Sequence, residues 1–131
     1  MMEYLGIGTL VLLASLMIGL RWYMVSKARA GEGKPLPVLD GEFGAAIRVQ
    51  KRSLLYFFSP HCGPCRAMTP VIDRLVAEHN NVFKFDVAGN IDIARRLQVM
   101  ATPTVMLVTP RVVEKVIIGP LSEARLRALL E

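Results

Sequence analysis

The two cysteines of the chain, Cys62 and Cys65, stand where a buried strand is expected to give way to a helix. Before them, residues 53–59 (SLLYFFS) form a continuous apolar run, which is typical of a central strand covered on both faces. After them, residues 64–79 repeat apolar side chains at helical spacing. This strand, turn and helix constrain the fold more than any other stretch, because a buried strand that leads into an amphipathic helix requires a sheet with a helix packed on it.

The rest of the chain after residue 38 alternates in the same way. Helices are expected over 40–50, 91–97 and 122–131, and strands over 82–87, 104–109 and 112–118. The last two strands are about two residues apart and therefore predict a hairpin. The order indicates an α/β fold, with a central mixed β-sheet flanked by helices on both faces and its parallel half first.

The position of the cysteines favours redox chemistry. Free backbone N–H groups and the positive end of the helix dipole favour a thiolate at Cys62, which makes it the attacking group. Cys65 follows one helical turn later, near enough to close a small disulfide ring. Gly63 allows close backbone approach, and Pro64 stiffens the first turn, where its missing N–H costs nothing. A C-x-x-C pair near a βαβ pattern is a redox signal.

Three other uses of the cysteines are weaker. A structural zinc site needs four ligands, and His61 is the only other local candidate. Covalent haem attachment needs a histidine where Arg66 stands. A purely structural disulfide gains little stability from so short a loop. We therefore expect no metal and no organic cofactor, and a redox-active Cys62–Cys65 disulfide in their place.

The N-terminal segment is long and apolar enough to cross a membrane. Residues 4–20 carry no charge, and the apolar run resumes after Arg21 up to Val25. A helix over residues 4–20 rises about 26 Å, and one that continues to Val25 spans a bilayer core of about 30 Å. We expect an N-terminal transmembrane anchor at 1–25, with residues 4–25 in the bilayer, a linker at 26–37 and the α/β domain at 38–131.

Two alternatives for this segment stay open. A cleaved signal peptide needs a positive start and a nearby cleavage site, but Glu3 is the only charged side chain before the run, and Ala28–Arg29–Ala30 is distant. A core helix needs a second apolar helix to pack on, and the sequence offers none.

The charges suggest an orientation for the anchor. Arg21 ends the uncharged run, Lys27, Arg29 and Lys34 come after it, and Glu3 precedes it. The positive-inside rule then places the domain in the cytoplasm, and we expect a single-pass protein of a bacterial inner membrane. A periplasmic domain requires the opposite topology. The net charge of +5 suits a domain near anionic lipid and is too dilute to indicate nucleic-acid binding.

Residues 38–131 resemble the thioredoxin family. The resemblance rests on the tetrapeptide Cys62-Gly63-Pro64-Cys65 with Arg66 and Pro70 after it, on the loop Ala101-Thr102-Pro103-Thr104, on Lys84 and on Gly119. It implies a thioredoxin-like fold with a cis peptide bond before Pro103; without it, an ordinary trans proline is the simpler expectation.

The resemblance also implies an activity, the reduction of disulfides in partner proteins by the Cys62–Cys65 dithiol. Thr102, Pro103 and Gly119 then bind the substrate chain, with the Thr102 backbone pairing as in strand addition. A thioredoxin reductase or a membrane electron carrier is the expected electron donor. Two alternatives remain: a periplasmic reductant for cytochrome maturation or disulfide isomerisation, and a non-catalytic membrane adaptor.

Two residues depart from the family pattern. His61 replaces the usual tryptophan; its cation would favour the Cys62 thiolate, or it is simply an exposed polar residue. Tyr56 replaces a buried acid that is held to help deprotonate the second cysteine, and it is a poor base at neutral pH. Lys84 thereby loses its expected partner, and we expect its amine to reach toward Tyr56 and Cys65.

Overall fold

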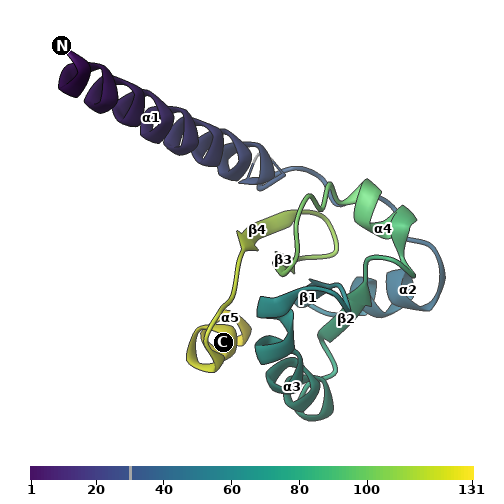
Figure 1. Cartoon of the computed structure of the whole chain (residues 1–131). Helices are drawn as coiled ribbons and strands as arrows, with labels where there is room; N and C mark the ends of the chain where they lie inside the picture. Colours follow the sequence, from purple (N-terminus) through teal and green to yellow (C-terminus); the bar gives the residue numbers. More distant parts are fainter. Residues whose placement is uncertain (30) are drawn as a thin grey trace.

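The computed structural model describes residues 1–29 and 31–131 and has the expected α/β architecture. Its elements are α1 (Met2–Arg29), α2 (Gly41–Val49), β1 (Ser53–Phe58), α3 (Gly63–Glu78), β2 (Val82–Asp86), α4 (Ile91–Arg96), β3 (Thr104–Val108), β4 (Val113–Ile118) and α5 (Glu123–Leu130). These elements match the segments that the apolar patterns predict, with small differences at their ends. Figure 1 shows α1 extending away from the layered domain.

The sheet has four strands in the order β2-β1-β3-β4. β1 runs parallel to β2 and antiparallel to β3, and β3 and β4 form the expected antiparallel hairpin. The side chains of residues 54–57 in β1 are 0% exposed. This burial explains the continuous apolar run, because a strand with neighbours on both edges and helices on both faces has no side in contact with water.

Two helices cover each face of the sheet (Figure 1). On one face, Ile72 of α3 and Leu126 of α5 pack in a cluster with Tyr56. On the other face, Ile47 of α2 belongs to a cluster with Phe57. Consecutive side chains of β1 therefore pack in the clusters on opposite faces, because successive side chains of a strand point to opposite sides of the sheet. The active-site strand is held from both sides.

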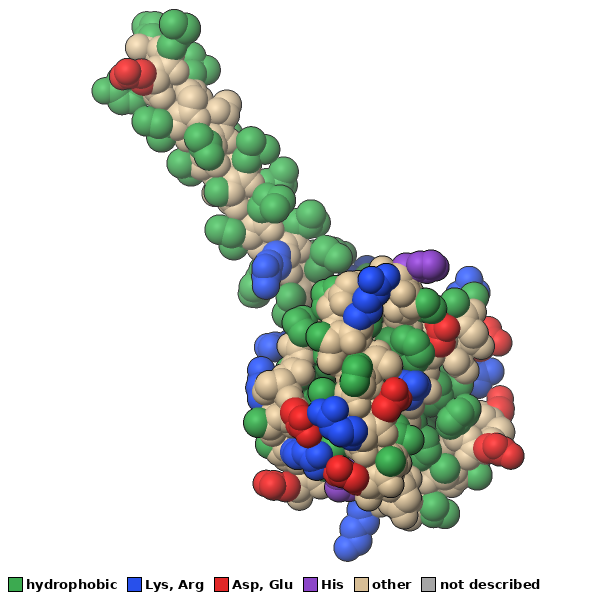
Figure 2. Space-filling model, turned by 60° about the horizontal axis from the view of Figure 1, so that its bottom comes forward, with side chains coloured by type: hydrophobic (Ala, Val, Ile, Leu, Met, Phe, Trp, Pro, Cys, Tyr) green, Lys and Arg blue, Asp and Glu red, His purple; other side chains and the backbone are tan. Residues whose placement is uncertain are grey.

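The helix α1 is exposed along its whole described length, and Figure 2 shows apolar side chains over the face in view. Residues 2–27 satisfy the length and composition of a membrane span, and an 18-residue stretch of them has a mean hydropathy of 1.8. The helix continues to Arg29, beyond the anchor expected at 1–25. The linker expected at 26–37 and the motif Ala28–Arg29–Ala30 include Ala30, which lies outside the described residues.

Residues 31–36, here called the edge segment, lie along the start of β4 and the two residues before it. Gly33 N donates to Val113 O (2.7 Å), Val113 N donates to Lys34 O (3.0 Å), and Leu36 N donates to Arg111 O (2.8 Å). The sequence predicted only a linker at 26–37. The edge segment pairs with the sheet because β4 is an edge strand whose backbone groups need partners, and such pairing requires no apolar pattern.

Candidate active site

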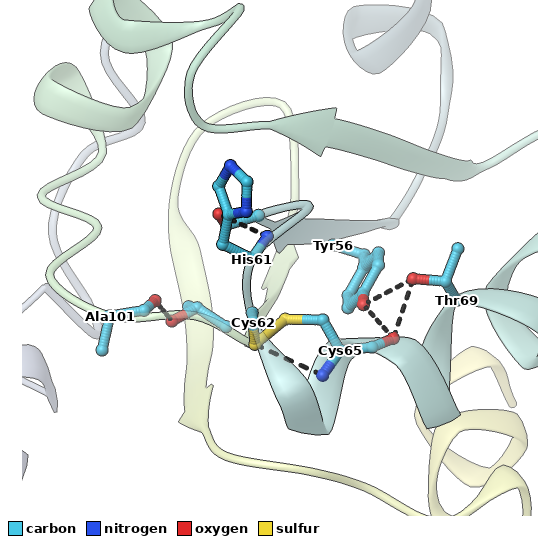
Figure 3. The surroundings of a disulfide bond; sticks show 8 residues. Tyr56, His61, Cys62, Cys65, Thr69 and Ala101 are labelled. Carbon is cyan, nitrogen blue, oxygen red and sulfur yellow. Dashed lines mark hydrogen bonds between the residues drawn. A yellow bond between two sulfur atoms is a disulfide. The ribbon is translucent and has the colours of Figure 1, made fainter.

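The cysteine pair lies at the junction between β1 and α3 and forms a disulfide (Figure 3). Cys62 is the N-cap of α3, and its Sγ accepts a hydrogen bond from Cys65 N (3.3 Å). The Cys62 side chain is partly exposed, whereas Cys65 is 1% exposed. An incoming thiol or disulfide therefore reaches Cys62 first, and the helix terminus favours a thiolate there in the reduced protein.

Gly63 and Pro64 form the exposed turn between the cysteines. Pro64 stands in the first turn of α3, where its missing N–H leaves no bond unmade. A Cβ added to Gly63 would meet no atom within 4 Å beyond its two neighbours and the nearby backbone of its own helix. The close backbone approach expected at Gly63 therefore does not come from within the chain, and only a docked partner could supply it.

Tyr56 lies beneath the disulfide turn and is 0% exposed. Its hydroxyl lies 3.3 Å from Cys65 O and 3.2 Å from the hydroxyl of Thr69, which itself donates to Cys65 O (2.8 Å; Figure 3). Burial raises the pKa of Tyr56 above its ordinary value of 10.0. The phenol is therefore neutral at physiological pH, and it holds the first turn of α3 without acting as a base.

Replacing Tyr56 with phenylalanine tests this role. Tyr56→Phe removes one buried hydroxyl but leaves the ring, and we expect a loss of about 0.5–1.5 kcal/mol in the free energy of unfolding at pH 7. Because the folded pKa is raised, the wild type keeps this group's contribution below pH 10 and loses it as pH rises further. Urea unfolding followed by circular dichroism between pH 7 and pH 11 should show a steeper alkaline decline in the wild type. Parallel alkaline declines in the two proteins would contradict the pKa argument.

Lys84 has a different partner from the one expected. It pairs with Tyr56 across β1 and β2, so the two side chains share a face of the sheet. Its Nζ contacts Asp73 Oδ1 of α3 at 2.8 Å and lies 5.4 Å from the centre of the Phe58 ring. The sequence reasoning missed Asp73, a charged residue on the helix that covers this face. The amine therefore lies on the face of the sheet that carries Tyr56, as expected, but its partner is Asp73 and not a group at Cys65.

The Lys84–Asp73 pair should contribute little to stability or to catalysis. Both side chains are about a third or more exposed, so a double-mutant cycle of Lys84→Met and Asp73→Asn should give a coupling of about 0.2–1 kcal/mol. The pH profile of disulfide reduction should stay the same in Lys84→Met, because Asp73 holds the amine. A shifted pH profile in Lys84→Met would show that Lys84 takes part in proton transfer during the reaction.

The loop before β3 completes the site. The Thr102–Pro103 peptide bond is cis, as the resemblance implies, and Ala101 lies among the residues around the disulfide (Figure 3). Pro103 O accepts a hydrogen bond from Gly119 N (2.9 Å), and Gly119 has φ +102°, a conformation that favours glycine. In the described part of the chain, the Thr102 backbone makes no hydrogen bond and remains available to a partner.

His61 lies on the exposed side of the turn, and its backbone N donates to Ser59 Oγ (3.3 Å). Figure 3 shows the imidazole directed away from the two sulfur atoms. The geometry thus gives its cation no direct contact with Cys62. In residues 1–29 and 31–131, no three His, Cys, Asp or Glu side chains gather as metal ligands would.

The fold and the cysteine pair define a thiol–disulfide oxidoreductase. The thioredoxin family model matches residues 34–131. A thioredoxin from Mycobacterium bovis is 30% identical over 95 residues, which cover 70% of this chain and 82% of that protein. The chain belongs to the thioredoxin family.

Two further comparisons agree. Oxidised mitochondrial thioredoxin 3 from Saccharomyces cerevisiae is 31% identical with a TM-score of 0.55, over 66% of this chain and 83% of that one. A bifunctional thioredoxin reductase/thioredoxin from Mycobacterium leprae is 30% identical over 80% of this chain. The match spans 24% of that longer protein.

Proposed function

We propose that this protein is a membrane-tethered reductase of protein disulfides. The observation that carries the proposal is the arrangement of the cysteines: a partly exposed Cys62 at the N-terminus of α3, disulfide-bonded to a buried Cys65. An accessible nucleophile backed by a shielded second thiol suits exchange with a large partner, because a second external thiol cannot easily reach Cys65.

The reaction proceeds in two exchanges. In the reduced protein, the Cys62 thiolate attacks one sulfur of the partner disulfide; a mixed disulfide forms, and the other partner sulfur leaves as a thiolate. Cys65, deprotonated, then attacks Cys62 Sγ and releases the second partner sulfur. The partner gains two electrons and two protons, and the Cys62–Cys65 disulfide forms. Since Tyr56 is neutral, the Cys65 proton passes to water or to the leaving partner thiolate.

The loop beside the disulfide supplies the substrate contacts in this proposal. Thr102 offers its free backbone N–H and C=O to an extended chain, and Pro103 and Gly119 shape the turn that presents them. The chemistry of the dithiol needs neither a metal nor an organic cofactor. A thioredoxin reductase, the activity named in the bifunctional relative, or a membrane electron carrier would restore the dithiol.

The membrane part of the proposal rests on α1. Its apolar length and the basic residues that follow it favour a single-pass protein of a bacterial inner membrane, with the domain on the cytoplasmic side. An impermeant thiol reagent applied to intact cells should leave Cys62 unlabelled. Labelling of Cys62 there would favour the periplasmic alternative, in which the domain serves cytochrome maturation or disulfide isomerisation.

The turnover of insulin disulfides by the full chain in detergent tests the catalytic part. We expect reduction that depends on an added thiol as electron source. A chain that binds partners without accelerating reduction would instead be the non-catalytic adaptor.

A further inference from the structure

A hollow of about 430 Å³ lies between the anchor helix and the active-site end of the domain. One wall is the stretch of α1 from Met17 to Val25, and the other is formed by Met100–Ala101 and Ile118–Gly119. Arg21 is the single charged residue in these walls. The hollow, here called the anchor groove, is therefore an apolar space that joins the anchor to the domain.

The anchor groove borders the cis-proline loop of the active site. Ala101 lines it and also lies among the residues around the disulfide (Figure 3). Gly119 lines it as well, and its N–H donates to Pro103 O of the cis-proline loop. A chain lying in the anchor groove would therefore pass beside the cis-proline loop, which lies next to the disulfide.

The edge segment connects the end of α1 to the β4 edge of the sheet. Glu32 N donates to Arg29 O at the end of α1 (2.9 Å), and Glu32 Oε1 accepts from Val116 N of β4 (2.8 Å). With the backbone pairs of Gly33 and Leu36 described above, residues 32–36 are bonded both to the end of α1 and to the sheet edge. These bonds keep the domain close to α1. A flexible linker would instead let the distance between them vary.

The depth of α1 in the bilayer determines whether lipid or water lies next to the anchor groove. If residues 4–25 lie in the bilayer, the wall from Met17 to Val25 is at the level of the lipid or its interface. The opposite wall must sit at the same level, and its Met100 and Ile118 side chains are 53% and 37% exposed. Exposed apolar side chains beside a membrane anchor fit an apolar, membrane-bound neighbour.

We propose that the substrates of this reductase are integral membrane proteins whose disulfide lies at the bilayer surface, and that the segment carrying it enters the anchor groove. This inference rests on the function proposed above. The dithiol gives two electrons to that disulfide, the partner becomes a dithiol, and the Cys62–Cys65 disulfide forms.

The test uses the full chain, reduced beforehand, in vesicles of phosphatidylethanolamine and phosphatidylglycerol. One reconstituted substrate is a transmembrane peptide with a disulfide hairpin directly after its helix. The other carries the same hairpin on a rigid helical spacer of about 30 residues, which raises it by about 45 Å. We expect reduction of the low hairpin to be at least about tenfold faster, because the anchor raises its effective concentration at Cys62.

A flexible Gly/Ser insertion of about 20 residues after Arg29, with a span of about 25 Å, should remove this preference without changing the rate on soluble insulin. The matched control carries the same Gly/Ser segment appended after Glu131, and it should keep the preference for the low hairpin. Equal rates on the two hairpins, or a preference that survives the insertion after Arg29, would overturn the inference. If the unmodified chain did not reduce insulin at all, the proposed function would instead be overturned.

A photo-reactive residue in place of Met100 tests the occupant of the groove. Cross-links to the low-hairpin peptide support the proposal. Cross-links confined to lipid, or to a second copy of this chain, would overturn the docking of a partner segment there.

Discussion

Cys62→Ser should abolish the reduction of insulin disulfides, lowering the rate by roughly 10³-fold or more, as expected for the loss of a covalent nucleophile. The physical reason is the position of Cys62. It caps α3, where backbone N–H groups and the helix dipole favour the thiolate, and it is the exposed member of the pair. A serine hydroxyl at the same position does not ionise at neutral pH and cannot form a disulfide with the partner.

The matched control is Ser59→Ala, on the same turn, which removes a hydroxyl that accepts a hydrogen bond from His61 N but leaves both sulfurs. We expect it to retain most of the activity. Substantial insulin reduction by Cys62→Ser would show that another group carries the attack, and the assignment of Cys62 as nucleophile would be lost.

Phe57→Ala should cost about 3–5 kcal/mol in the free energy of unfolding, a large part of the 5–15 kcal/mol that is typical of a small domain. Phe57 lies in β1, is 0% exposed and stacks on Phe85 with ring centres 5.2 Å apart. Truncation to Cβ leaves a cavity between the sheet and its covering helices, and these rigid elements can close it only partly.

Urea unfolding followed by far-ultraviolet circular dichroism measures this loss, since the single tryptophan, Trp22, lies in α1 and does not report on the domain. The control is Phe43→Ala in α2. Phe43 also packs against Phe85, with ring centres 4.9 Å apart, but it is 40% exposed and should cost well under half as much. Equal losses for the two variants would mean that burial does not set the cost at Phe57.

The sequence predicts the helices and strands well because their apolar patterns record burial. The run 53–59 is apolar at consecutive positions because β1 is covered on both faces and flanked on both edges. Ser122, the first residue of the helix expected at 122–131, is the N-cap of α5, and its Oγ accepts a hydrogen bond from Arg125 N (3.3 Å). The register of the sheet could not be read in the same way, because an apolar strand can pair with its neighbour in several alignments.

The contacts that the sequence did not predict are tertiary. Asp73 and Lys84 come from a helix and a strand, and only the packing of α3 on the sheet brings them together. The edge segment pairs with β4 through backbone groups, and the pattern of side chains does not predict such pairing. The direction of the His61 ring depends on the local turn, and sequence reasoning supported both of its possible roles.

The central claim is that Cys62 bonds covalently to the partner and that Cys65 is shielded until it releases the partner. It is tested most directly by mass spectrometry of Cys65→Ser and Cys62→Ser, each incubated with a disulfide-bonded peptide. Cys65→Ser should accumulate a stable mixed disulfide at Cys62, whereas Cys62→Ser should form little adduct at the buried Cys65. Adducts that form equally fast on the two variants, or only on Cys62→Ser, would contradict the account.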